Sequence, residues 1–91
     1  MPNTEPKKIV HVAVGVIVDA NQHILIALRP DNVHQGGLWE FPGGKVERNE
    51  TVESALDREL FEELGLRVVS CEQLVKIQHD YTDKSVLLDV W

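Results

Sequence analysis

The segment of residues 44–66 constrains this 91-residue chain more than any other part of its sequence. Thr51 suits the N-cap of a helix, because its hydroxyl can accept a hydrogen bond from an unpaired amide of the first turn. Glu53 complements the helix dipole in that turn. Gly65 suits the left-handed residue that follows a helix C-terminus. The sequence therefore predicts a helix over residues 52–64, bounded at both ends.

The predicted helix is amphipathic, and its acidic residues lie next to its buried side. At 3.6 residues per turn, its apolar residues fall on one stripe. This stripe consists of Val52, Leu56, Leu60 and Leu64. Glu59, Glu62 and Glu63 share an adjoining face, where like charges one turn apart destabilise an isolated helix. We therefore expect a positive group beside these three carboxylates.

A hard divalent cation meets that requirement. Mg2+ favours a few carboxylate oxygens together with water and phosphate oxygens. Such an ion would bind a diphosphate and lower the pKa of an attacking water. Arg58 is placed to pair with Glu62 one turn further on and to orient it. The alternative interpretation is an exposed helix face on which acidic and basic side chains form ordinary ion pairs.

A glycine-containing turn is predicted before the helix, at residues 41–45. Pro42 fixes one backbone dihedral, and Gly43 and Gly44 permit positive φ. The backbone could therefore approach a metal ion or a phosphate closely. A plain tight turn is the alternative.

Together these residues fill a spaced pattern that resembles the Nudix box, the signature of the Nudix hydrolases. The pattern is G-x5-E-x7-R-E-U-x-E-E-x-G-U, with U apolar, and its positions are Gly44, Glu50, Arg58, Glu59, Leu60, Glu62, Glu63, Gly65 and Leu66. Other parts of the chain are similar to the MutT-like subgroup. They are residues 11–17, residues 38–47, and Arg29 at the end of a predicted strand. The resemblance implies an α/β Nudix fold, in which a mixed β-sheet is held between helices.

The resemblance also implies a role for each matched residue. Glu59, Glu62 and Glu63 match the carboxylates that bind the catalytic metal ion, and the Gly43 carbonyl matches a further ligand. Arg58 belongs to the same catalytic set, whereas Glu50 matches a position of secondary importance. The residues expected at the substrate are Arg29, Phe41, Gly44 and Lys45. The implied metal ion is Mg2+, which Mn2+ could replace.

MutT-like enzymes hydrolyse oxidised purine nucleoside triphosphates such as 8-oxo-dGTP to the monophosphate and pyrophosphate, and so protect DNA from mutation. The resemblance implies this Mg-dependent activity, with a small nucleotide as the partner. One alternative is a Nudix hydrolase with another nucleoside diphosphate-linked substrate, such as a dinucleoside polyphosphate, a nucleotide sugar or a capped RNA. The other is a non-catalytic nucleotide-binding module. The complete set of box carboxylates favours an enzyme.

Composition narrows the function classes further. The formal charge of −6 argues against binding to a nucleic-acid polymer, since surfaces that coat nucleic acids concentrate Lys and Arg. The lone Cys71 excludes an internal disulfide and favours a reducing, cytoplasmic setting, with Cys71 as an inert strand residue. The apolar run at residues 9–18 is too short to span a membrane. No membrane partner is therefore expected.

The remaining apolar patterns predict strands. Valines alternate with other mostly apolar residues at 9–18, which is typical of a central strand covered on both faces, and His11 within it is expected to be structural. The strand predicted at residues 23–28 should pair with the strand at 9–18 as a hairpin. The predicted strands are 9–18, 23–28, 66–79 and 85–91, with turns at 19–22 and 80–84 and a loop at 31–38. Residues 66–79 could form either one long strand or a bent pair of strands. Trp39 beside that loop is expected to pack, and His34 is left without a role.

We expect one domain over residues 8–91, preceded by an extended or disordered arm at residues 1–7. MutT-like enzymes are longer, and this chain stops at Trp91 inside an apolar strand. We therefore expect a Nudix domain without its C-terminal strands and second helix, and with the family's further carboxylate and purine-reading residue beyond Trp91. An exposed final strand would also allow self-association, because unpaired edge backbone invites strand addition.

Overall fold

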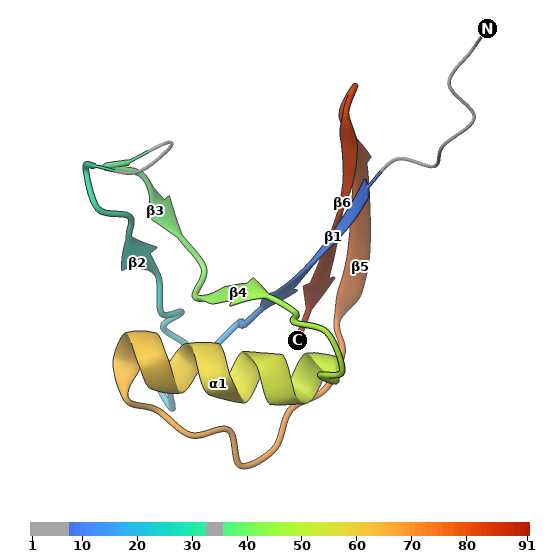
Figure 1. Ribbon diagram of the computed structural model, residues 1–91. Coiled ribbons are helices and arrows are strands. Elements are labelled where there is room, and N and C mark those ends of the chain that lie inside the picture. Colours follow the sequence, from blue (N-terminus) through green and yellow to red (C-terminus); the bar gives the residue numbers. More distant parts are fainter. Residues whose placement is uncertain (1–7, 33–35) are drawn as a thin grey trace, which may run out of the picture.

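The computed structural model describes residues 8–32 and 36–91. Its elements are β1 (Lys8–Val14), β2 (Ala27–Leu28), β3 (Trp39–Glu40), β4 (Gly43–Lys45), α1 (Val52–Leu64), β5 (Val75–Asp80) and β6 (Lys84–Val90) (Figure 1). The expected arm at residues 1–7 and His34 lie outside the described residues. In the part of the chain that is described, no helix has the length and apolar character needed to cross a membrane.

β1 lies inside a four-stranded mixed sheet of order β4-β1-β6-β5. It pairs antiparallel with β4 and parallel with β6, and β5 and β6 form an antiparallel hairpin. α1 packs against β1 and β4 (Figure 1). The predicted α/β class and mixed sheet are confirmed, as is the central position of the first strand. That strand is shorter than predicted, because β1 ends at Val14 rather than at residue 18. Residues 8–32 and 36–91 contain one helix, so the second helix of the expected sandwich is not among them.

α1 begins and ends where its capping residues predict. The Thr51 hydroxyl accepts a hydrogen bond from the Ser54 amide at 3.1 Å, an interaction that stabilises a helix by about 1 kcal/mol. Gly65 follows the helix with a left-handed φ of 69°, and its amide donates to the Phe61 carbonyl at 2.9 Å. Local chemistry alone therefore sets both limits of the helix.

The core lies between α1 and β1 and is small. Its buried members are Ala13, Ala55, Leu56 and Leu60, with Val52 and Leu64 packed at its margin. The predicted apolar stripe is thus confirmed, and each buried leucine contributes roughly 1.5–3 kcal/mol. Gly15 lets the helix approach β1, since a Cβ there would lie 3.2 Å from Leu56 Cδ1.

The hairpin predicted between the first two strands forms only next to its turn. An isolated antiparallel bridge between Val18 and Ile24 joins the two segments, with hydrogen bonds from the Asp19 amide to the His23 carbonyl and from the Leu25 amide to the Ile17 carbonyl. The Asp19 carboxylate closes the turn by accepting hydrogen bonds from the His23 and Asn21 amides, and these bonds lower its pKa. β2 is consequently confined to two residues, and it pairs with β3 instead.

The strand predicted over residues 66–79 forms only in its second half, as β5. Residues 66–74 are an irregular connection held against α1 by Asp57. Its carboxylate accepts hydrogen bonds from Arg67 Nη1 at 3.0 Å and from the Val68 amide at 2.8 Å. Cys71 lies in this connection rather than in a strand, and burial raises the pKa of its thiol. A raised pKa agrees with the expected inert side chain.

β6 confirms the last predicted strand and the turn before it, but it is not an edge. It lies between β1 and β5, so the expectation of an exposed C-terminal strand is wrong. β5 is the edge strand on this side, and all six of its residues are exposed. Self-association through the last strand therefore loses its basis.

Asp89 is a buried charged residue that the sequence patterns did not reveal. It is 2% exposed, and it accepts hydrogen bonds from the His11 ring, the Gln73 amide group and the Trp91 indole at 3.0, 2.8 and 2.7 Å. Burial raises the pKa of its carboxyl, but these hydrogen bonds outweigh that effect and hold the pKa below its usual value. The contact agrees with the structural role expected for His11.

Candidate active site

Two glycines bring β4 against both β1 and α1. Residues 43–45, predicted as part of a turn, form β4 because they pair antiparallel with β1. Gly43 has a φ of 147°, and a Cβ there would overlap the Ala13 carbonyl oxygen. A Cβ on Gly44 would overlap the Glu59 carboxyl group. Glycine is therefore required at position 43 by the close approach to the β1 backbone. At position 44 it leaves the space that the Glu59 carboxyl group occupies.

Arg58 is the centre of an ion-pair network beside these glycines. Its Nε and Nη2 donate to the two carboxylate oxygens of Glu50 at 2.8 and 2.9 Å. Nη1 donates to Glu59 Oε1 at 2.7 Å, and Nη2 also donates to the Lys45 carbonyl at 3.0 Å. Arg58, helped by the Glu47 amide, lowers the pKa of Glu50 to about 2, and these carboxylates raise the pKa of Arg58. Arg58 therefore ties the loop before α1 and β4 to the acidic face of the helix.

The partner predicted for Arg58 from helix spacing is a minor one. Arg58 Nη1 lies 3.6 Å from Glu62 Oε2, and the Glu62 side chain is 58% exposed. Glu50, to which the resemblance assigns a secondary role, makes the shorter contacts. Glu47 Oε1 of the same loop lies 3.8 Å from Arg58 Nη2. Helix periodicity could not reveal these partners, because they lie in a loop that folds back along the helix.

Glu63 shows how much negative charge gathers where α1 meets β4. Partial desolvation raises the pKa of its carboxyl, and a hydrogen bond with the Gly43 backbone counteracts that effect. The charges of Glu59, Glu40 and Glu62 raise the pKa further. Carboxylates that disfavour one another's ionisation form an environment that a bound cation would stabilise.

The donor set fits a hard divalent cation, but the side chains are not gathered into a finished site. Carboxylate oxygens and a backbone carbonyl are the ligands that such ions prefer. Within residues 8–32 and 36–91, no group of three or more His, Cys, Asp or Glu side chains is arranged to hold a metal ion. Glu59 is bonded to Arg58, and Glu62 extends into solvent. Glu59 and Glu62 would therefore have to turn toward an ion held by Glu63 and Gly43.

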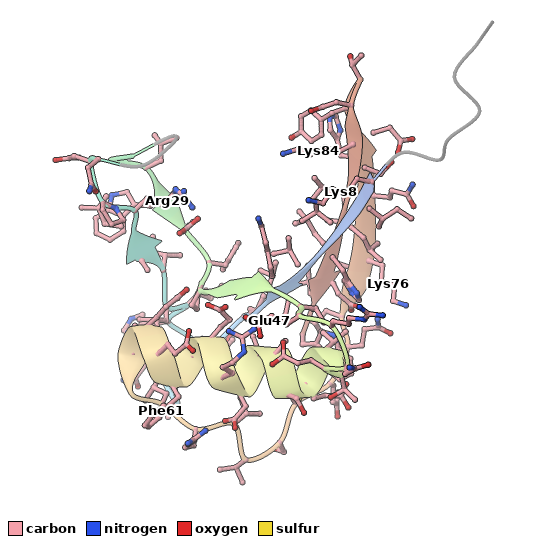
Figure 2. All side chains as sticks on the ribbon, in the orientation of Figure 1. Lys8, Arg29, Glu47, Phe61, Lys76 and Lys84 are labelled. Atoms are coloured by element: carbon pink, nitrogen blue, oxygen red, sulfur yellow. The ribbon has the colours of Figure 1, made fainter. Side chains whose placement is uncertain are left out.

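Arg29 directly follows β2 and lies on the β2–β3 hairpin, which rises beside α1 (Figure 2). Its Nη1 lies 3.2 Å from Glu40 Oε2 of β3. Glu40 in turn contributes to the raised pKa of Glu63, so the hairpin is linked electrostatically to the acidic face of α1. The sequence patterns did not single out Glu40. The signal that could have identified Glu40 is its position in the sequence, directly before the residues that lead into β4.

The aromatic residues near β4 are open to solvent. Phe41, expected to line a base pocket, is 46% exposed, and Lys45 is also exposed. Trp39 is 64% exposed, so the expectation that it packs is wrong. The reason is that β2 and β3 form a two-stranded sheet that is separate from the four-stranded sheet. This part of the molecule offers ring surface without an enclosed pocket.

A cavity of about 560 Å³ lies along the apolar stripe of α1, and none of the box carboxylates borders it. It is bordered by Leu56 and Leu60, by residues 15–18, by the connection 66–72, and by Leu74 and Trp91. Its lining is mainly apolar and includes none of the predicted site residues. The candidate active site is therefore an open surface at the junction of α1 and β4 rather than this cavity.

Comparison with known proteins identifies the class that this fold and site define. The NUDIX domain model matches residues 13–91, so the chain belongs to the Nudix family. The chain is a MutT-like member: it is 51% identical over 82 residues to the 8-oxo-dGTP diphosphatase of Proteus vulgaris, and 37% identical over 84 residues to that of Escherichia coli K12. Among solved structures, the E. coli ORF135 protein matches with a TM-score of 0.80 at 39% identity, covering 93% of this chain and 60% of that one.

The chain is shorter than the proteins it matches. The alignments cover 90% of this chain and 73% of the P. vulgaris protein, and 92% of this chain and 65% of the E. coli diphosphatase. A relative of different name, the CTP pyrophosphohydrolase of E. coli K12, is 41% identical over 78 residues, which are 86% of this chain and 58% of that protein. Nudix enzymes generally depend on a divalent metal ion, in agreement with the donor set at α1 and β4.

Proposed function

We propose that the protein is a Mg2+-dependent nucleoside triphosphate pyrophosphohydrolase that converts oxidised purine nucleotides such as 8-oxo-dGTP to the monophosphate and pyrophosphate. The observation that carries this proposal is the acidic face of α1 held against the Gly43–Gly44 backbone by Arg58. The similarity of the chain to diphosphatases named for 8-oxo-dGTP supports the choice of substrate. The lone Cys71 and the nucleotide substrate favour a cytoplasmic setting.

In this proposal Glu59, Glu62 and Glu63, with the Gly43 carbonyl, hold the divalent ion. When bound, the ion neutralises phosphate charge and lowers the pKa of an attacking water. Arg58 positions Glu59 through the 2.7 Å hydrogen bond. The absence of a side chain at Gly44 leaves room for the Glu59 carboxylate, and Lys45 next to it offers an exposed positive charge to a phosphate group.

Arg29 and Phe41 are proposed to contact the nucleotide beyond the diphosphate. A guanidinium can bind a phosphate oxygen or a purine edge, and an aromatic ring gives a base a surface to stack on. Arg29 would exchange its contact with Glu40 for one with the substrate, since that ion pair is partly exposed and such pairs are weak.

A second candidate substrate is CTP, favoured by the similarity to the E. coli CTP pyrophosphohydrolase. The carboxylates and Gly43 handle the phosphate chain common to both nucleotides, so they do not discriminate between them. The two nucleotides would be distinguished through contacts with the base. In this proposal the exposed β2–β3 hairpin makes those contacts. A non-catalytic binding module is less favoured, because the box keeps all of its carboxylates.

The test is release of monophosphate and pyrophosphate by this protein from 8-oxo-dGTP, dGTP and CTP, each with and without Mg2+. The P. vulgaris relative serves as the positive control. We expect Mg2+-dependent turnover with 8-oxo-dGTP preferred over dGTP. Preference for CTP would transfer the substrate assignment to the second candidate. No turnover by this chain or by a form extended past Trp91 to the length of the relative, under conditions where the relative is active, would contradict the enzyme proposal.

A further inference from the structure

β5 closes the sheet on the side away from β4, and its outer edge is open in the described part of the chain. The strand order ends at β5, and every residue from Val75 to Asp80 is exposed. The β5–β6 hairpin extends well beyond α1, so the helix does not cover it (Figure 1). An exposed edge of this length is a template for pairing with another strand.

The hydrogen-bond pattern shows which residues of β5 face that open edge. The Tyr81 amide donates to the Lys84 carbonyl at 2.7 Å, which marks these two as a hydrogen-bonded pair. In an antiparallel ladder such pairs alternate with non-bonded ones. Val75, Ile77 and His79 therefore bond to β6, and the other three residues direct their amides and carbonyls outward. These outward residues are Lys76, Gln78 and Asp80.

The outward residues are complementary to themselves under a two-fold axis. If two β5 strands pair antiparallel about Gln78, Lys76 of each copy lies directly opposite Asp80 of the other. Opposite charges at directly paired positions stabilise a sheet. A register centred on Lys76 or on Asp80 would instead oppose like charges, and the intermediate registers lose both ion pairs. The charge pattern therefore selects one register.

The same register matches the other face of the strand. There Ile77 lies opposite His79, and Val75 lies opposite Tyr81. Val75, Ile77 and Tyr81 are 47%, 49% and 48% exposed in the single chain. Cross-strand pairs of aromatic and apolar side chains contribute to sheet stability, and these pairs would bury part of that exposed surface. Lys76 stands at the open side of the sheet, where a partner strand would lie (Figure 2).

We propose that two copies of this chain associate through β5, antiparallel and centred on Gln78, so that the two sheets join into one. The interface is isologous, since the same strand of each copy forms it. Association stops at two copies, because each copy has one β5 to contribute. It lies across the sheet from β4 and away from the acidic face of α1. The carboxylates of the candidate active site are therefore left accessible in the dimer.

The test is the solution mass of the wild-type chain and of two charge variants, measured by sedimentation equilibrium over a range of concentrations. We expect wild type to reach twice the 10.3 kDa of the single chain. K76D and D80K should each stay monomeric, because like charges then oppose one another at both ion pairs. Mixed in equal amounts, the two variants should restore the double mass, since each Asp then faces a Lys.

This mixing result separates the interface from a folding defect, because an unfolded variant would not pair. Gln78→Pro gives an independent backbone test: its amide faces outward, so the substitution removes a hydrogen bond of the proposed interface but none to β6. It should abolish the dimer while circular dichroism stays that of wild type. Ile77→Pro is the matched control and should unfold the hairpin. A monomeric wild type at every concentration, or a dimer that survives K76D and D80K alone, would overturn the proposal.

Discussion

The junction of α1 with β4 and the β2–β3 hairpin are built in opposite ways. At the junction, two glycines remove side-chain bulk, Arg58 binds carboxylates of two segments, and capping residues set the helix limits. In the hairpin, each strand has two residues and Trp39 is exposed. The comparison indicates that the two regions have different roles. The packed junction holds the groups proposed to act on the diphosphate shared by Nudix substrates, and the open hairpin is left to distinguish what is attached to it.

The largest effect is expected at the packed junction, for Glu63→Gln. It keeps the size of the side chain but removes a proposed metal ligand, so kcat should fall about 10²–10³-fold, as for loss of one electrostatic group from an active site. The measurement is steady-state hydrolysis of 8-oxo-dGTP. Glu72→Gln, an exposed site in the 66–74 connection, is the control and should leave kcat unchanged. Equal activity of wild type and Glu63→Gln would remove Glu63 from the site.

Gly44→Ala tests whether close packing positions Glu59. The added Cβ would overlap the Glu59 carboxyl group and displace it, and a displacement of about 1 Å in a catalytic group can reduce the rate about 10²-fold. Gly65→Ala is a matched control. A Cβ there meets nothing within 4 Å, but φ is 69°, so stability should fall while activity is retained. Equal activity of Gly44→Ala and Gly65→Ala would contradict the claim that close packing positions Glu59.

Glu50→Gln tests whether Arg58 is held from the loop before α1. Loss of such a supporting contact typically reduces metal affinity about 10–100-fold, and we expect this range for Mg2+. The variant should also change acid stability. The pKa of Glu50 is lowered from 4.5 to about 2, so its contribution is present above pH 4.5 and is lost as the pH falls toward 2.

Urea unfolding between about pH 5 and 2, roughly the interval spanned by the two pKa values, measures this contribution. Wild type should lose stability more steeply with falling pH than Glu50→Gln. Glu47→Gln is the control, because Glu47 lies 3.8 Å from Arg58 and is 68% exposed. Parallel stability curves for wild type and Glu50→Gln would show that the ion pair contributes nothing to folding.

The smallest effect on folding is expected in the hairpin, for Trp39→Ala. Because Trp39 is 64% exposed, its loss should change the free energy of unfolding by no more than about 0.5 kcal/mol. If the hairpin contacts the nucleotide, KM for 8-oxo-dGTP should rise while kcat stays near that of wild type. A large loss of stability would instead mean that Trp39 is a packing residue, and the contrast between the two regions would disappear.

The parts of this fold that the sequence predicted are those determined by local chemistry. Thr51 and Gly65 set the ends of α1 through bonds to residues a few positions away, and the stripe of Leu56 and Leu60 follows from helix geometry. The box carboxylates were recognisable because their spacing is a property of one helix. Apolar periodicity likewise revealed the central position of β1.

The parts that the sequence did not predict depend on partners distant along the chain. Residues 66–74 had a strand-like composition, but Asp57 draws them onto the helix. Residues 43–45 had the composition of a turn, but pairing with β1 makes them a strand. Glu50 was underrated because its contact with Arg58 spans eight positions and requires the loop to fold back. The position of β6 inside the sheet followed only from its parallel pairing with β1.

The most direct test of the central claim is to locate the divalent ion on this chain by paramagnetic broadening of backbone amide signals with Mn2+. The account predicts that broadening at low Mn2+ concentration is confined to amides near Gly43, Glu59, Glu62 and Glu63, that Mg2+ competes it away, and that Glu63→Gln weakens it. Broadening centred elsewhere, for example at Glu72 or Asp80, or unchanged in Glu63→Gln, would contradict the claim that the α1–β4 junction holds the ion.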